Sequence, residues 1–92
     1  MSDDDAPVVI PITGELDLHP FAPRDVVDVV SDYLDECRSR GIHEVRLVHG
    51  RGTGAQRAAI RRLLATRTDV ASFADAPPIS GGWGATIVRL VP

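Results

Sequence analysis

Two histidines and one aspartate carry most of the chemistry that this sequence offers. Asp17 and His19 lie two residues apart in Glu15 to His19, where polar and apolar residues alternate. Their side chains should therefore project from the same face of a strand. His49 follows a second apolar segment, Val45 to Val48. A histidine can move a proton near neutral pH, and an aspartate can hold its tautomer and favour its charged form. These three candidate catalytic residues suit phosphodiester chemistry.

A glycine-rich loop follows His49 and precedes a helix-like run from Gln56 to Leu64. Alternating glycines let the backbone adopt positive φ and approach a ligand closely. The free N–H groups at the start of the helix point back at this loop and favour an anion. An arginine within the loop can stabilise charge on phosphate oxygens. The residues predicted to bind phosphate are Gly50, Arg51, Gly52, Thr53 and Gly54.

The charges are unevenly distributed along a chain whose net charge is −3. Six arginines and no acid lie between Val45 and Thr68, whereas five acids and no base lie between Asp25 and Glu36. The absence of lysine suggests a bias toward arginine codons, which explains the residue type but not the clustering. We expect one positive and one negative side, with Arg57 and Arg61 contacting a polyanion from the second helix.

The elements that must position these residues follow the order strand, helix, strand, helix, strand, strand. This order predicts an α/β fold, a two-layer sandwich with two helices and a four-stranded mixed sheet that ends in a hairpin. The carboxyl ends of the first two strands should open onto one crevice. Thr53 and Gln56 match a capping box at the start of the second helix. The predicted elements span 15–19, 23–40, 44–49, the helix around 56–64, 70–74 and 85–91.

The length of 92 residues predicts one domain, which we place at 15–92 after an acidic flexible tail and extended arm at 1–14. No apolar run approaches the roughly 20 residues of a membrane span. The acidic start is unlike a secretion signal, so a cytoplasmic protein is expected. The single cysteine, Cys37, falls on an apolar helix stripe and should be buried, whereas His43 should be exposed.

Each functional assignment has a plainer alternative. Asp17 could simply bond loop amides, and His19 could be structural. The loop glycines could serve only the tight turn. Asp17, His19 and His49 could bind a metal, but without a tight ligand motif we predict no built-in metal site. Trp83 could stack on a base or cover the edge of the core.

Three ordered motifs closely resemble those of the Smr (small MutS-related) domain family. They are Leu16-Asp17-Leu18-His19, His49-Gly50-Arg51-Gly52-Thr53-Gly54 and Gly82-Trp83-Gly84-Ala85-Thr86. The resemblance runs from about Glu15 to Leu90 and implies an α/β sandwich like the C-terminal domain of translation initiation factor three. It also implies nucleic-acid binding and, in many members, endonuclease activity. The family's first two motifs, held to form its active site, map onto Asp17, His19, His49, Gly50, Arg51, Gly52 and Gly54.

Family members attached to MutS-like proteins are linked to DNA nicking and recombination control, and others cleave RNA, including messages on stalled ribosomes. This sequence departs from the family pattern at Pro20, where glycine is frequent, and at Arg51, where lysine is common. Pro20 stiffens the exit from the first motif, whereas Arg51 keeps the positive charge. Members usually carry the domain at the end of a longer protein, and we expect this one to be a stand-alone short member.

Two main hypotheses follow. The first is an endonuclease that cleaves or nicks RNA or DNA. On RNA, His19 or His49 would take the proton of a 2′-hydroxyl while the other protonates the leaving oxygen. On DNA, a water nucleophile and a divalent cation such as magnesium would be needed. The second is a non-catalytic module that binds structured or branched nucleic acid through the arginine-rich face, with the ribosome as one candidate partner. A small-molecule phosphate enzyme fits less well, because the chain is short for a deep pocket.

Overall fold

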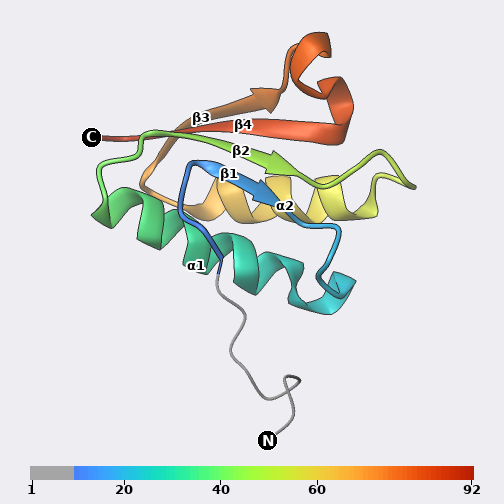
Figure 1. Cartoon of the computed structure of the whole chain (residues 1–92), viewed down its shortest axis with the longest axis horizontal. Helices are drawn as coiled ribbons and strands as arrows, with labels where there is room; N and C mark the ends of the chain where they lie inside the picture. The colour runs from blue at the N-terminus through green and yellow to red at the C-terminus, as the bar shows by residue number, and fades with distance from the viewer. Residues whose placement is uncertain (1–9) are drawn as a thin grey trace, which may run out of the picture.

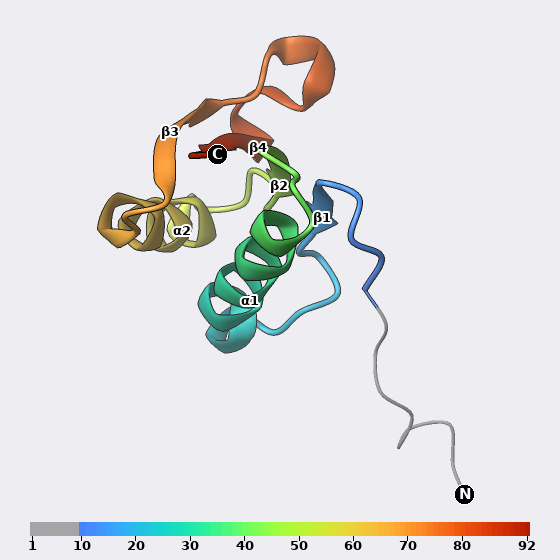
Figure 2. The same cartoon turned by 90° about the vertical axis from the view of Figure 1, so that its left-hand side faces the viewer.

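A four-stranded mixed sheet carries two helices on one of its faces, as two views of the computed structural model show (Figure 1, Figure 2). The structure describes residues 10–92, so the predicted acidic tail up to position 9 lies outside the described residues. The strands are β1 (Glu15–Asp17), β2 (Glu44–Val48), β3 (Val70–Asp75) and β4 (Ala85–Leu90). The helices are α1 (Val26–Ser39) and α2 (Ala55–Thr66), with 3₁₀ turns η2 (Pro23–Asp25), η3 (Pro78–Ser80) and η4 (Gly82–Gly84). This is the α/β fold that the order of elements predicted.

The pairing of the strands brings two chain segments to one edge of the sheet. The spatial order is β1-β2-β4-β3, and β1 runs parallel to β2 with Asp17 opposite Val48. The residues that follow these two strands therefore emerge side by side, as predicted from the crossover rule. β4 is antiparallel to both β2 and β3, which confirms the hairpin predicted at the end of the chain.

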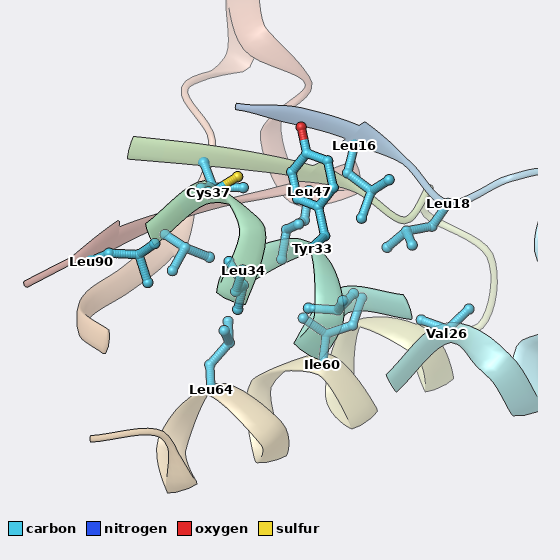
Figure 3. Close-up of a cluster of buried hydrophobic side chains, with 13 residues drawn as sticks. Leu16, Leu18, Val26, Tyr33, Leu34, Cys37, Leu47, Ile60, Leu64 and Leu90 are labelled. Atoms are coloured by element: carbon cyan, nitrogen blue, oxygen red, sulfur yellow. The ribbon is translucent and has the colours of Figure 1, made fainter. Parts of the chain in front are cut away.

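The buried core lies between the sheet and the helices (Figure 3). Leu16 and Leu18 enter it from the first strand segment, as the alternation of polar and apolar residues predicted. Residues at helical spacing supply the opposite side of the core. From α1 these are Val26, Val30, Tyr33, Leu34 and Cys37, and from α2 they are Ile60 and Leu64. Cys37 is buried and His43 exposed, both as predicted.

One core residue also fixes the start of β1. The Tyr33 hydroxyl donates a hydrogen bond to the Glu15 carbonyl at 3.0 Å and accepts bonds from the N–H groups of Thr13 and Gly14. The preceding residues, Ile10 and Ile12, pack against the core as an arm without strand structure. Tyr33 thus anchors the strand that leads to the first chemical motif.

Two local predictions need correction. The first strand ends at Asp17 rather than His19, because the N–H of His19 turns to the Asp17 side chain instead of the sheet. The capping box at α2 does not form. Gly54, at φ +84°, occupies the N-cap position of α2, and no side chain caps the helix. Thr53 is thereby moved one residue ahead of the cap. In the described part of the chain, no helix has the length and apolar character needed to cross a membrane.

Candidate active site

Asp17 and His19 form a hydrogen-bonded dyad at the carboxyl end of β1. The Asp17 carboxylate accepts a bond from the backbone N–H of His19 at 3.0 Å and from its ring Nδ1 at 2.5 Å. These two bonds lower the pKa of the Asp17 carboxyl, the backbone bond contributing most. Asp17 therefore binds a backbone amide, as the structural alternative predicted, and also binds the His19 ring. Because Nδ1 donates to the carboxylate, a neutral His19 ring leaves the lone pair of Nε2 free.

The Nε2 edge of the His19 ring lies against the glycine loop. Gly50 has φ +79°, and a Cβ placed on it would come within 3.0 Å of Nε2 of His19. Glycine is needed here for two reasons, namely the left-handed backbone and the close approach of the imidazole. The two motifs meet at this contact, although thirty residues separate them in the sequence.

His49 has a different environment from His19. It is only 7% exposed, and both of its ring nitrogens bind protein groups. Nδ1 donates to the carbonyl of Gly50 at 2.9 Å, so Nε2 of the neutral ring accepts from the hydroxyl of Thr86 at 2.9 Å. Burial lowers the pKa of His49, which favours the neutral form of the ring. This geometry suits a residue that holds the loop in position.

The loop surrounds a hollow of about 280 Å³ at the amino end of α2. Its lining comes from Pro23 of η2, from His49 directly after β2, from the glycine loop and from the first turn of α2. The loop arginine, Arg51, is exposed and forms no ion pair with any residue from 10 to 92. An exposed cation beside a helix start provides a favourable place for an oxyanion. Among the predicted phosphate-binding residues, those on the hollow are Gly50, Arg51, Gly52, Thr53, Gly54 and Arg57.

The predicted positive side is wrong in part, because acids from other segments neutralise much of the arginine run. Arg57 and Arg61 do share one flank of α2, but both donate to the Asp75 carboxylate of β3, at 2.7 and 2.6 Å. These bonds lower the pKa of Asp75, chiefly through Arg57. The other two pairings join Arg46 to Glu15 and Arg67 to Asp35 and Asp69. Glu15, Asp35 and Asp75 are distant in sequence and Asp69 lies just beyond the run, so a count along the run did not include them.

Trp83 lies beside the hollow rather than over the core. Its indole is 42% exposed and approaches the position that a Cβ on Gly54 would occupy, at 3.7 Å. The guanidinium of Arg57 lies 5.4 Å from the ring centroid. The alternative in which Trp83 covers the edge of the core is therefore wrong, and the indole forms a half-exposed aromatic surface next to the start of α2. Such a surface is available for stacking.

Sequence reasoning missed two residues of this site. Thr86 lies within the third motif, and its 37-residue separation from His49 hid the hydrogen bond. A polar residue that shares the inward face of its strand with Val88 and Leu90 was the available signal. Asp75 ends β3 without any local pattern linking it to α2. Within residues 10–92, no three His, Cys, Asp or Glu side chains are grouped so that they could hold a metal ion.

Comparison with known proteins places this sandwich and its loop in a family. The Smr domain model matches residues 16–91, so the chain belongs to the Smr domain family. A relative from Thermus thermophilus, named Endonuclease MutS2, is 46% identical over 85% of this chain. An Endonuclease MutS2 from Pelotomaculum thermopropionicum is 40% identical over 86% of it. The chain spans only about 10% of the length of these relatives.

Two solved structures share the fold. The crystal structure of the Smr domain of Thermus thermophilus MutS2 has a TM-score of 0.81 and 46% identity, covering 85% of this chain and 98% of that one. The structure of YdaL, a stand-alone small MutS-related protein from Escherichia coli, has a TM-score of 0.75 and 25% identity. That match covers 86% of this chain and 65% of YdaL. These similarities confirm the predicted family and the α/β fold.

Proposed function

We propose that the protein is a nucleic-acid endonuclease whose Asp17–His19 dyad cleaves a phosphodiester bond held at the glycine loop. The observation that carries this proposal is the position of His19, with Nδ1 bound to Asp17 and Nε2 directed at Gly50. A base fixed in this way needs no rearrangement before it accepts a proton. The names of the relatives, Endonuclease MutS2, support the same reaction class.

On RNA, Nε2 of His19 would remove the proton of the 2′-hydroxyl. The 2′-oxygen attacks phosphorus, the bond to the 5′-oxygen breaks, and water gives that oxygen its proton. The ionised Asp17 stabilises the imidazolium that forms. Arg51 and the N–H groups at the start of α2 stabilise the charge on the phosphoryl oxygens. On DNA, water replaces the 2′-hydroxyl, and Asp17 with the substrate phosphate would hold a divalent cation such as magnesium.

In this proposal His49 is a positioning residue. Its ring joins the Gly50 carbonyl to the Thr86 hydroxyl, so it connects the glycine loop to β4. The revised role leaves His19 as the proton-transferring imidazole of the site. Arg57, beside Trp83, would lie near a nucleic-acid strand at the glycine loop. Arg61, one turn further along α2, would act indirectly, through the Asp75 carboxylate that it shares with Arg57.

The test is a cleavage gel with labelled single-stranded RNA, single-stranded DNA and branched DNA, each with magnesium or a chelator. His19→Ala and Asp17→Asn should each lower the cleavage rate by at least about a hundredfold. Both should retain binding, because neither removes the loop or Arg51. His43→Ala is the matched control, since His43 is exposed. Full activity in both dyad variants would overturn the mechanism.

A non-catalytic binding module is the second candidate, favoured by the exposed Arg51 beside the helix start. Such a module would shift every band in the gel and leave the strands intact. Its affinity should fall as salt rises, because counterions are released from the bound phosphates. Cleavage of any substrate that is abolished by His19→Ala rejects this candidate.

A further inference from the structure

The connection between β3 and β4 projects on the face of the sheet that carries no helices. It stands above the sheet on the side opposite to the helices in both views (Figure 1, Figure 2). Hydrogen bonds within it run from the N–H groups of Ser80 and Gly82 to the Pro77 carbonyl, at 2.8 and 3.0 Å. A third runs from Gly84 to Gly81 at 3.0 Å. The projection therefore has a defined shape without any partner.

The projection holds an isoleucine in solvent. Ile79 is 96% exposed and follows two exposed prolines, Pro77 and Pro78. Its β-branched side chain has few rotamers and loses little freedom on contact. One exposed apolar residue is ordinary on a protein surface. Ile79 differs in that its segment is hydrogen-bonded to the candidate active site.

Hydrogen bonds join the projection to the glycine loop and to β2. The Gly84 carbonyl accepts bonds from the N–H groups of His49 and Gly50, at 3.1 and 2.9 Å. Directly after Ile79 in the chain, the Ser80 carbonyl accepts a bond from Nε of Arg46 on β2 at 2.8 Å. These hydrogen bonds fix the backbone on both sides of Ile79 relative to the glycine loop, where a phosphate strand would bind.

We propose that Ile79 is an apolar wedge that enters the base stack of a duplex beside the phosphodiester bound at the glycine loop. Apolar side chains used in this way unstack and kink a base step, while neighbouring cations hold the flanking phosphates. Unstacking costs least where stacking is already interrupted. The substrate class is accordingly a duplex with a bulge, nick or branch. This inference takes its orientation from the proposed function.

A protein partner would need a broader apolar surface than this. Within residues 10–92, the large hydrophobic side chains with high exposure are Ile79 and the half-exposed Trp83. Specific protein interfaces bury on the order of 800 Å² on each partner around a packed apolar centre. A single exposed apolar side chain on a hydrogen-bonded turn better suits insertion at one base step.

The test uses RNA and DNA duplexes with 2-aminopurine beside a one-nucleotide bulge, and the same duplexes without the bulge. The wild-type chain should raise the fluorescence of the bulged duplexes on binding, because the base loses its stacking partner. Ile79→Ser should abolish this rise and weaken binding to the bulged duplex about tenfold. Its affinity for the continuous duplex should stay within about twofold. Ile79→Met, which keeps an apolar wedge, should restore the fluorescence rise.

The outcomes separate this inference from the proposed function. An equal fluorescence rise and equal affinity in Ile79→Ser overturn the wedge, whether or not the chain cleaves. An Ile79-dependent rise without cleavage supports the wedge and rejects the nuclease. His19→Ala should abolish cleavage and keep the rise. Capture of a protein through Ile79, with no effect on the duplexes, also overturns the wedge. Circular dichroism should show unchanged melting for both Ile79 variants, since the side chain is in solvent.

Discussion

Replacing Thr86 with valine tests whether His49 holds the glycine loop or transfers protons. Thr86 is fully buried, and its hydroxyl lies 2.9 Å from Nε2 of a histidine that is only 7% exposed. Valine keeps the shape of the side chain but leaves that ring nitrogen without a donor. A buried polar group left unsatisfied costs about 1–3 kcal/mol. For a domain of this size, each kcal/mol corresponds to roughly 4–8 °C in Tm.

The stability assay is urea unfolding followed by circular dichroism, with thermal melting as a second measure. Thr86→Val should lower the free energy of unfolding by about 1–3 kcal/mol. Thr68→Val is the control, because Thr68 is exposed and its substitution should change stability by less than about 0.5 kcal/mol. Equal stability of the two variants would refute the hydrogen bond on which the role of His49 rests.

The activity of Thr86→Val then separates the two roles of His49. If His49 only positions the loop, the variant should lose affinity and rate while its pH–rate profile keeps the wild-type shape. If His49 transfers protons, releasing Nε2 changes the environment of a titrating group, and the profile should shift. A shifted profile would refute the positioning role and return His49 to the reaction.

Two further variants test the contacts around the loop. Gly50→Ala should lower both stability and cleavage, because its methyl group would meet the His19 ring at 3.0 Å, whereas Gly41→Ala, at a similar φ of +74° but in open space, should lower only stability. Equal activity of the two glycine variants, measured at a temperature where both are folded, would contradict the close approach. Asp75→Asn should release both helix arginines and tighten nucleic-acid binding. The slope of log affinity against log salt should steepen by about 0.7–0.9 for each phosphate newly contacted, with Asp28→Asn on the exposed face of α1 as the control.

The fold could be predicted from local patterns because each element carries its own period. Leu16 and Leu18 alternate with polar residues, and the stripe from Val26 to Cys37 repeats at helical spacing. Short strands and a crossover helix then leave few possible topologies. The same reasoning placed Asp17 near His49, because parallel neighbours end at one edge. Strand pairing brings the residues that follow β1 and β2 to one edge of the sheet, as predicted.

The protonation roles within the site could not be predicted in the same way. His19 and His49 look alike in the sequence, since each follows a strand. They differ only through partners brought by the fold: Asp17 and open solvent for one, Thr86 and burial for the other. A hydrogen bond between residues 37 positions apart leaves no periodic trace in a single sequence. Side-chain chemistry at the site is therefore decided by packing rather than by motif.

The charge of the arginine run also depends on partners that only the fold brings close. In the described chain, Arg46, Arg57, Arg61 and Arg67 are paired with acids, so long-range attraction of a polyanion is weaker than the run suggests. Surface charges more than about 10 Å apart are also screened at ordinary salt. The exposed Arg51 and the start of α2 can fix one phosphate, but every nucleic acid offers the same phosphate. Under the proposed function, discrimination among nucleic acids would come from groups that contact the bases, and the half-exposed Trp83 and the exposed Ile79 are the candidates for this contact.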